Sequence, residues 1–468
     1  MKNRSNRNIF TTFITVIFLT GCSLTPDYER PTVNTPAWKG GEVSQNVEIA
    51  ADWWKGYGSN ELNTLIEQAL AHNNDLQASL HRIEQARAGL QIAGASLLPS
   101  ASVTTSFMNG PKQAFNITDR RNKGVPEFTG DAGISYELDL FGANRAEVEE
   151  SEANLLGTQY AHEALALIVM GDVAQGYFNV VNLRELRRIA SDNVKIVEDL
   201  LKVVEARFQN GSVTALDIAQ QETVLSNTKA ELAAVEQKLA LAENALAVIL
   251  GQPPQTIDVS GRNLNNITLP PLVVVQPAEL LERRPDIRKA EADLIAANAD
   301  IGAARAAFYP SLNLGSNLLL AANPSASALL LVSSLSAPIF QGGRLEGGLK
   351  RTKERQAELV ENYKKAVLVS FQETEDALTK VKTTQTRQDA LRQAVTKSRK
   401  AYEIARSQYQ LSVVDFQTVL NAQRLMLQAE DNHARARFDT LSNSIDLFKS
   451  MGGGWNVNET QSVKNEGD

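Results

Sequence analysis

The chain has 468 residues, of which 43% are hydrophobic and 22% are charged, a balance typical of a folded protein. Its formal net charge is −7, which argues against nucleic acid as a partner, because nucleic-acid binding needs a basic face. The single cysteine leaves none for a disulfide within the chain, so stability must come from packing.

The first 21 residues have the pattern of a signal peptide. A basic start is followed by an apolar run from Ile9 to Leu19, which is too short to span a membrane comfortably. The run ends in the motif LTGC, which resembles a bacterial lipoprotein box and in which Cys22 would become the lipidated first residue. Ser23, rather than Asp, follows Cys22, as in lipoproteins of Gram-negative bacteria that are exported to the outer membrane. A cleavage site with a chance cysteine is the alternative.

Residues 22–60 predict an extended, lipidated N-terminal arm. The segment contains Pro26, Pro31 and Pro36, and the fixed backbone angle of proline suits an extended chain laid against the rest of the protein. A helix is expected from residue 61, with Ser59 or Asn60 as its cap.

The two halves of the chain contain copies of one segment. Residues 81–103 align with 292–314 without a gap, and Pro99 and Ser100 match Pro310 and Ser311. Further along, LFGANR (140–145) lies over IFQGGR (339–344), and RFQNGSV (207–213) lies over QYQLSVV (408–414). A duplication of this kind predicts a repeated structural unit. The expected parts are a first repeat (61–251), a linker or equatorial segment (252–277), a second repeat (278–450) and a polar C-terminal tail (451–468).

Each repeat contains two segments that we expect to be strands. The alternation is clear in 128–140 and 311–318, weaker in 100–107, and least regular in 326–338. A period of two gives a sheet with one apolar and one polar face. An ordinary half-buried sheet of a soluble domain has this signature, and so do strands that cross an outer membrane.

A very long helical stretch follows each strand pair, at about 144–208 and 345–409. About 65 helical residues span roughly 100 Å, some three times the thickness of a bilayer core, so these helices belong in water. The chain then reverses at 209–214 and 410–415 and returns with leucine-rich heptads that predict coiled coils. No uninterrupted apolar run of about 18 residues follows Cys22, so a membrane-spanning helix is not expected.

The sequence lacks the patterns of catalytic and metal sites. Its four histidines are scattered, and neither a Cys/His cluster nor a GxSxG elbow nor a P-loop occurs. The glycines near residue 342 lack the Lys-Ser/Thr of a phosphate-binding loop, so we interpret them as joints between strand and helix. The expected joint residues are Pro99, Pro310, Gly142, Gly342 and Gly343. We therefore expect no enzyme, no metal and no cofactor.

Taken in order, these motifs resemble the TolC-like outer membrane efflux proteins, and within them the lipoprotein (NodT-type) branch that serves resistance-nodulation-division (RND) pumps. The segments that carry the resemblance are LTGC (19–22), DWWKGYGSNEL (52–62), LLPS (97–100), YELDLFG (136–142), LLERRPDIRKAEADL (280–294), FYPS (308–311), APIFQGGR (337–344) and LNAQR (420–424).

The resemblance implies a mixed α and β fold in a homotrimer. Four strands per chain would form a twelve-stranded β-barrel in outer membrane lipid, continued into the periplasm by a barrel of long coiled-coil helices. A periplasmic membrane fusion (adaptor) protein and an inner-membrane RND pump would dock at its end, and the channel would pass drugs or other toxic small molecules passively. The strands themselves show only that one copy is too few, because about eight are needed to close a barrel; the trimer rests on the resemblance.

The resemblance also implies a periplasmic gate at the helix reversals. Family members carry Asp residues just after the second reversal, where this chain has Asp415; a helix cap or solvated turn is the alternative role for it. Gln417 and Asn421 stand where Leu and Asp are common in the family. The turn residues are Asn210 and Gly211 in the first repeat and Ser412, in place of the usual Gly, in the second.

Two other functions have the same general pattern. A duct for protein secretion would share the fold, and a coiled-coil lipoprotein without a channel would share the helices but not the alternating strands. Copper or silver export is a possible specialisation, yet five Met and four His form no obvious ligand cluster.

Overall fold

The computed structural model describes residues 23–41, 43, 49–107, 128–261, 263–322 and 325–453. Residues 1–22, which include Cys22 and the predicted signal peptide, residues 108–127 and the residues from 454 onward lie outside the described residues. The chain divides into two compact units. The first unit comprises residues 1–32, 81–159 and 289–365, and the second comprises 33–80, 160–288 and 366–468. Each unit therefore draws on both halves of the sequence.

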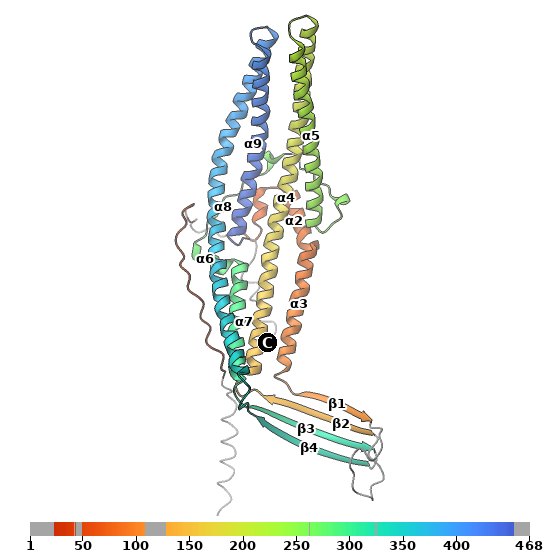
Figure 1. Ribbon diagram of the computed structural model, residues 1–468, viewed down its shortest axis with the longest axis vertical. Helices are drawn as coiled ribbons and strands as arrows, with labels where there is room; N and C mark the ends of the chain where they lie inside the picture. Colours follow the sequence, from red (N-terminus) through yellow and green to blue (C-terminus); the bar gives the residue numbers. More distant parts are fainter. Residues whose placement is uncertain are drawn as a thin grey trace, which may run out of the picture. The chain divides into compact units, whose positions relative to one another are not determined.

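The helices occur in pairs of equal length, one from each half of the chain (Figure 1). Helices α3 (Asn74–Ala95) and α7 (Pro285–Ala306) have 22 residues each. Helices α4 (Ala143–Gln209) and α8 (Arg344–Gln410) have 67 each, and α5 (Ala215–Ile249) and α9 (Phe416–Ser450) have 35 each. Shorter elements are η1 (Trp53–Tyr57), α2 (Asn60–His72), η3 (Pro254–Thr256), η4 (Leu264–Asn266) and α6 (Pro277–Arg283). The predicted duplication and the predicted mixed fold are confirmed.

The strands of the first unit form one antiparallel sheet in the order β1-β2-β3-β4 (Figure 1). They are β1 (Ser100–Phe107), β2 (Phe128–Leu138), β3 (Ser311–Ala322) and β4 (Ser325–Ser336). Among the described residues, β1 and β4 each pair on one side only. The sheet is therefore open, with a free edge along each outer strand.

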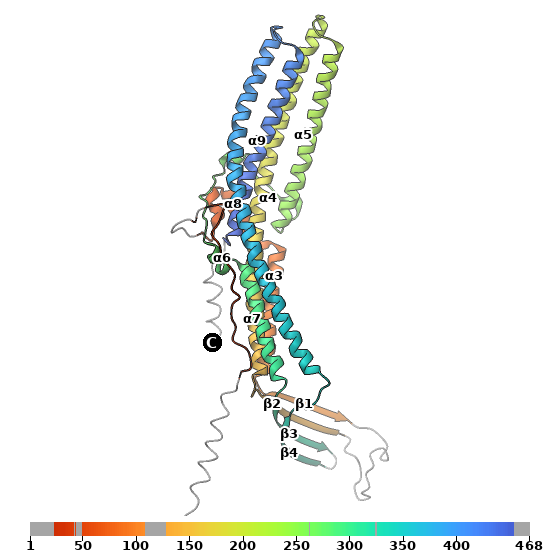
Figure 2. The same ribbon diagram turned by 60° about the vertical axis from the view of Figure 1, so that its left-hand side comes forward.

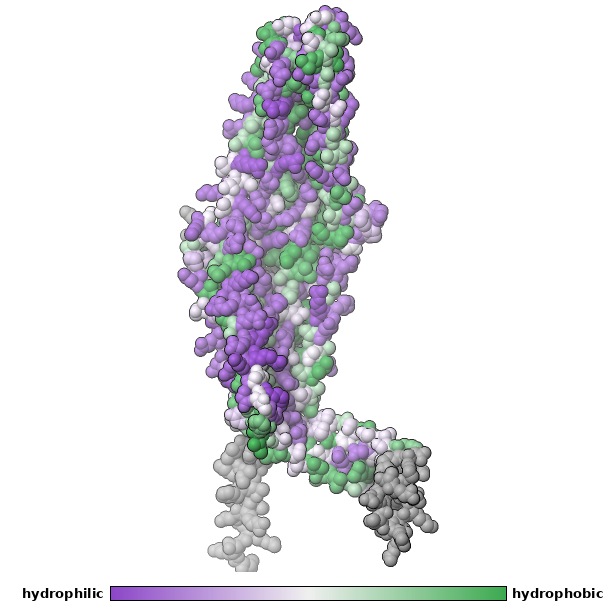
Figure 3. Space-filling model, viewed as in Figure 1, coloured by the Kyte–Doolittle hydropathy of each residue, from purple (hydrophilic) through white to green (hydrophobic). Residues whose placement is uncertain are grey.

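The two faces of the sheet differ in polarity, as the alternation predicts. Residues that lie opposite each other across antiparallel strands share a face. One face carries the apolar set Ala101, Val103, Ala132, Ile134, Leu314, Leu318, Leu329, Leu331 and Leu335. The other carries the polar set Ser102, Thr104, Thr129, Asp131, Ser135, Glu137, Asn313 and Asn317, together with the apolar Leu319, Leu330 and Val332. Figure 3 shows apolar residues on the surface of the sheet, and two of them, Val103 and Leu331, are more than three-quarters exposed.

The second unit is built around a core of aromatic and aliphatic side chains. The ring of Trp53 stacks on Phe448, with centroids 5.1 Å apart, and Tyr57 meets Phe178 edge-on. The hydroxyl of Tyr57 lies 2.7 Å from Ser444 Oγ on α9. Burial of the phenol in this core raises the pKa of Tyr57. The segment at η1 is thereby fixed to both repeats.

Helix α4 contains an 18-residue stretch that is apolar enough to cross a membrane by composition alone, which the sequence analysis did not anticipate. The stretch is 61% buried within the protein, and α4 contributes buried side chains such as Val173, Phe178 and Val181 to the core. Its apolar character is explained by packing in the core of the second unit.

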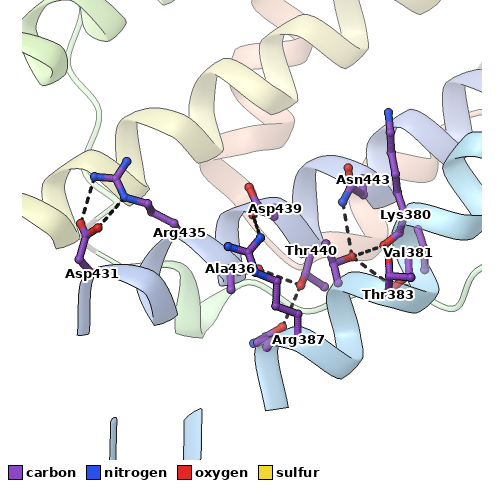
Figure 4. A network of polar contacts seen from close by, with 12 residues as sticks. Lys380, Val381, Thr383, Arg387, Asp431, Arg435, Ala436, Asp439, Thr440 and Asn443 are labelled. Carbon is purple, nitrogen blue, oxygen red and sulfur yellow. Dashed lines mark hydrogen bonds and ion pairs between the residues drawn. The ribbon is translucent and has the colours of Figure 1, made fainter. Parts of the chain in front are cut away.

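In the second unit, α4 with α5 and α8 with α9 run as two helical hairpins, which both ribbon views show (Figures 1 and 2). The seam between α8 and α9 contains polar pairs (Figure 4). Arg387 and Asp439 are 3.0 Å apart, and Thr440 donates to Gln388 over 2.9 Å. Such pairs complement the heptad packing predicted for these helices.

Candidate functional site

The reversal between α4 and α5 is closed by a glycine in the left-handed conformation. Gly211 has φ 73°, and its N–H donates to the carbonyl oxygen of Phe208 over 2.9 Å. The N–H of Ser212 donates to the carbonyl oxygen of Arg207 over 2.9 Å. This pair of bonds is the Schellman arrangement that ends many helices. The side chain of Asn210, just before the glycine, donates a hydrogen bond from Nδ2 to the carbonyl oxygen of Ala206.

The reversal between α8 and α9 has the same bonds without a glycine. The N–H groups of Ser412 and Val413 donate to the carbonyl oxygens of Tyr409 and Gln408, over 2.9 and 2.8 Å. Ser412 has φ 62° and is the one non-glycine residue with positive φ among the described residues. The left-handed conformation costs a residue with a Cβ about 1 kcal/mol. The second reversal is therefore the more strained of the two.

Arg207 joins the two reversals. Its Nη2 donates to Ser412 Oγ over 2.9 Å, and its Nη1 donates to the carbonyl oxygen of Tyr409. Its guanidinium also lies over the ring of Tyr409, with Cζ 4.3 Å from the centroid. Burial raises the pKa of Tyr409, and the charge of Arg207 opposes that rise. The end of the first hairpin is thereby attached to the end of the second.

Sequence reasoning did not identify Arg207. Its counterpart in the aligned segments RFQNGSV and QYQLSVV is Gln408. That Arg/Gln difference was the available signal, but the position of Tyr409 relative to Arg207 is a long-range contact that the alignment does not contain.

Asp415 is the N-cap of α9. Its Oδ1 accepts the N–H of Thr418 over 2.8 Å and also the Thr418 hydroxyl. These hydrogen bonds lower the pKa of the exposed Asp415 carboxyl. In the first repeat, Thr214 and Asp217 form a capping box at the equivalent start of α5. The capping role is therefore present at both reversals.

Gln417 and Asn421 line a cavity of about 710 Å³ between α4, α5 and α9. Asn421 Oδ1 accepts from Nη2 of Arg424, one helical turn further on, over 3.0 Å. Apolar side chains such as Leu420 and Leu427 share the lining with these polar groups. Asp415 does not line this cavity, so the three candidate gate residues do not converge on one point within the chain.

The joint between β2 and α4 is well packed. Asp139 accepts the N–H of Arg145 over 3.0 Å and its Nε over 3.1 Å, which caps the start of α4. The ring of Phe141 stacks on Tyr309, with centroids 4.6 Å apart. Gly142 has φ 75°, which glycine adopts without steric cost. Pro99 and Pro310 immediately precede β1 and β3.

The joint between β4 and α8 differs from it. Gly342 and Gly343 both have positive φ, and Gly343 immediately precedes α8 as Gly142 precedes α4. The expected correspondence of LFGANR with IFQGGR is therefore wrong by two residues, because a shared Phe and Arg guided the alignment. Among the described residues, Phe340 makes no ring stack like that of Phe141 on Tyr309. Phe340 is 88% exposed, and Ile339 is 99% exposed.

The N-terminal arm lies along α7 in the first unit. Arg30 forms a two-pronged ion pair with Glu291, over 2.6 and 2.8 Å. Asn298 and Arg305 donate to the carbonyl oxygens of Pro26 and Leu24. The arm is therefore held at successive points toward the carboxyl end of α7.

The part of the chain that the structure describes contains no group of three or more His, Cys, Asp or Glu side chains that could hold a metal. The buried Arg284 of the ERRPDI segment instead bonds to Asp286 and Glu373, both 2.7 Å from its Nη2. This cluster has the form of a structural ion-pair network.

Comparison with known proteins identifies the family. The model of the family described as outer membrane efflux protein matches residues 65–252 and 277–453. The pyoverdine export outer membrane protein OpmQ of Pseudomonas aeruginosa is 35% identical over 413 residues, covering 86% of this chain and 87% of that protein. The cation efflux system protein CusC of Escherichia coli K12 is 31% identical over 460 residues, covering 94% and 98%.

Solved structures agree with the sequence relatives. The CmeC outer membrane channel of Campylobacter jejuni superposes with a TM-score of 0.85 at 25% identity, covering 95% of this chain and 98% of that one. The MtrE outer membrane channel of Neisseria gonorrhoeae, in its open state, gives 0.81 at 26% identity, covering 92% and 98%. The chain therefore belongs to the outer membrane efflux protein family, the TolC-like channels of tripartite efflux systems, and it is not an enzyme.

Proposed function

We propose that three copies of this chain close their sheets into one twelve-stranded barrel, which serves as the passive exit duct of a tripartite pump. The observation that carries this proposal is the open four-stranded sheet, with an apolar face, a polar face and unpaired outer strands. Unpaired strand edges are satisfied when β1 of one copy pairs with β4 of the next. In a closed barrel the apolar face meets lipid and the polar face lines the lumen.

The N-terminal arm supports a lipid anchor at Cys22, which lies outside the described residues. Arg305 lies near the carboxyl end of α7, shortly before β3, and donates a hydrogen bond to the carbonyl oxygen of Leu24 over 3.1 Å. Two residues span at most about 7 Å, so acyl chains on Cys22 would enter the membrane close to the sheet. In this proposal residues 1–21 are the signal peptide and 22–60 the lipidated arm. The repeats 61–251 and 278–450 flank the linker 252–277, and 451–468 is the tail.

The gate is proposed at the helix reversals. Opening a ring of hairpins requires the second hairpin of each chain to move against the first, and Arg207 joins the ends of the two hairpins in the described contacts. Asp415 caps α9 next to the second reversal, and Gln417 and Asn421 line the cavity between α4, α5 and α9. The gate would open when a periplasmic adaptor protein and an inner-membrane RND-type pump engage this end.

The substrate class follows from the relatives only in outline. OpmQ is named for pyoverdine export, CusC for cation efflux, and TtgC of Pseudomonas putida for toluene efflux. These cargoes share little chemistry, so we infer that the duct passes what its pump delivers, including drugs and other toxic small molecules.

The mass of the detergent-extracted protein tests the proposal. Light scattering corrected for bound detergent should give a mass of three chains, and the same sample should conduct ions in a planar bilayer. A monomer stable under mild extraction would overturn the barrel, because four strands cannot close. A trimer that does not conduct ions would overturn the proposed duct function but would still support the trimeric assembly.

A further inference from the structure

The cavity between α4, α5 and α9 has walls from both helical hairpins of the second unit. Helices α4 and α5 supply one side from the first hairpin, and α9 supplies the other side from the second hairpin. The lining on α9 extends from Gln417 to Asp431, about 20 Å along the helix. The cavity volume of about 710 Å³ lies within the range of sites that bind drug-sized molecules.

The buried part of the cavity wall contains amide groups without partners. Asn193 of α4 is 8% exposed and Gln423 of α9 is 1% exposed, and both line the cavity. Among the described residues, Asn193 Oδ1 has no hydrogen-bond partner, and neither amide atom of Gln423 makes a hydrogen bond of ordinary geometry. A buried polar atom that lacks a partner destabilises a fold, so a bound molecule that supplies the partner would recover that loss.

The apolar part of the lining comes from all three helices. Its larger members are Leu186, Ile189, Val224, Leu420 and Leu427. Sites for small organic molecules are mostly apolar and contain a few polar groups that fix the orientation of the ligand. An aliphatic surface with buried amides therefore favours a ligand that has an aromatic or alkyl body and one polar end.

Three charged side chains also line the cavity, and two of them already have partners. Both oxygens of Asp431 accept from Arg435, over 2.8 and 3.0 Å. Arg424 donates to Asn421 over 3.0 Å. Glu231 of α5 forms no ion pair among the described residues. The Glu231 carboxylate and the buried amide oxygens are acceptors, so they suit a ligand that donates N–H groups.

We propose that this cavity binds a small organic amine, whose apolar body packs on the aliphatic lining and whose N–H groups donate to Asn193, Gln423 and Glu231. Such a molecule contacts both hairpins at once, so its binding favours the arrangement in which the hairpins are held together. The link to gating rests on the proposed function, whereas the binding site itself does not.

Calorimetric titration of the detergent-extracted full chain tests the site with three indole compounds of similar size. Tryptamine carries an ammonium, tryptophol a hydroxyl and indole-3-propionate a carboxylate. Tryptamine should bind most tightly and indole-3-propionate most weakly, because the unpartnered oxygens of the cavity are acceptors. Glu231→Gln should reduce the preference for tryptamine over tryptophol. Equal affinity for all three compounds, or no saturable binding of tryptamine, would overturn the proposal.

Asn193→Leu tests the buried amide. It replaces the side chain by an apolar one of similar size, so tryptamine should bind on the order of tenfold more weakly while the Tm stays the same or rises. The matched control is Asn182→Leu, since Asn182 is also a buried residue of α4 with an unpartnered Oδ1 but does not line the cavity. The control should bind tryptamine as wild type does, and equal weakening in both variants would overturn the site.

Arg207→Ala tests the link to gating, since Arg207 joins the hairpin ends and does not line the cavity. Loss of its contacts should lower the affinity for tryptamine several-fold, because the cavity needs both hairpins in place. Unchanged affinity would overturn the link to gating and support the binding site alone. The mass and the ion conduction of the same samples test the proposed function separately, so a failure of the duct is distinguishable from a failure of the site.

Discussion

Asn73 and Arg284 are equivalent residues of the two repeats, and each donates a side-chain hydrogen bond to the last residue of a long hairpin. Asn73 Nδ2 lies 2.8 Å from the carbonyl oxygen of Ile249, the end of α5, and Arg284 Nη1 lies 3.1 Å from that of Ser450, the end of α9. Equivalent hydrogen bonds in the two repeats therefore have different donors, a neutral amide in the first repeat and a buried cation in the second.

We predict that Arg284→Ala destabilises the protein more than Asn73→Ala. The arginine side chain is 9% exposed and neutralises Asp286 and Glu373, which its loss would leave facing each other. We expect a loss of about 2 kcal/mol for Arg284→Ala. Asn73→Ala removes the cap of α3, in which Oδ1 accepts from the N–H of Leu76, and should cost about 1 kcal/mol.

Thermal unfolding of the detergent-extracted protein measures both changes. Arg284→Lys serves as the control that keeps the charge but loses the two-pronged bond to Asp286, and it should fall between wild type and Arg284→Ala. An Arg284→Ala protein with the Tm of wild type would contradict the structural role of this cluster.

The N-terminal arm depends on a glycine in α7. A Cβ at Gly302 would lie 2.2 Å from Thr25 Oγ1 and 2.9 Å from Thr25 Cα, so the arm backbone would have to move. We therefore predict that Gly302→Ala loosens the arm, although alanine normally favours a helix by about 1 kcal/mol. Limited proteolysis near Arg30 should become faster in this variant.

Gly347→Ala is the matched control for the arm, since Gly347 also lies in a helix of the first unit but has open space where its Cβ would be. This variant should leave cleavage of the arm unchanged. Equal cleavage rates for both variants would show that the arm does not depend on the close approach at Gly302.

Much of the fold could be predicted because its limits are set by local residues. The long helices begin and end within one residue of the expected 144–208 and 345–409, since Gly142, Gly211 and Gly343 mark their ends. Strand β3 runs to Ala322, beyond the expected 318, because Leu319 and Leu320 break the alternation that was used to find its end. Helix and strand limits that neighbouring residues determine could therefore be predicted from the sequence.

The contacts of the candidate gate could not be predicted from neighbouring residues. The sequence places Asp415 at the reversal, but its hydrogen bond to Thr418 depends on the backbone geometry of the turn. The contact of Arg207 with Tyr409 depends on how two helices that are distant in the sequence pack together. The repeat alignment around Phe340 failed for a related reason. Gly142 and Gly343 each directly precede their long helix, so the shared Phe and Arg do not mark equivalent positions.

We predict that Arg207→Ala increases leakage of large antibiotics into cells, because it removes the contacts of one hairpin end with Tyr409 and Ser412 of the other. Uptake assays in cells that express the channel without its pump measure the effect. Arg207→Lys keeps a cation without the planar fork and should leak to an intermediate degree. If both variants stay as tight as wild type, the clamp is not part of the gate.

Asp415 allows its two possible roles to be separated. Asp415→Ala should raise the same leakage if the side chain belongs to a polar constriction. Asp415→Ser keeps a good N-cap for Thr418 but removes the charge, so it distinguishes charge from capping. Leakage in both variants would support the constriction, whereas a tight Asp415→Ser channel would assign the residue to the helix cap alone.

Cys22→Ser should abolish labelling of the protein by radioactive palmitate, because a serine hydroxyl cannot form the thioether of a lipoprotein. The four strands and the helices contain no part of this site, so the variant should still fold if it reaches the membrane. Ser23→Ala is the control, and it should label as wild type does. Continued labelling of the Cys22→Ser protein would refute the anchor.

Glu150 should make stability depend on pH. Burial raises the pKa of the Glu150 carboxyl above its ordinary 4.5, and the neighbouring Asp300, which hydrogen-bonds to it, raises it further. The folded protein therefore holds a proton that the unfolded chain has already released above about pH 4.5, so stability falls as pH rises through the raised pKa. Glu150→Gln removes this titration and should flatten the decline in Tm between mildly acidic and neutral pH. Glu149→Gln, at an exposed neighbouring position, should leave the slope unchanged. Identical slopes for wild type and Glu150→Gln would mean that the pair of carboxyls between α4 and α7 shares no proton.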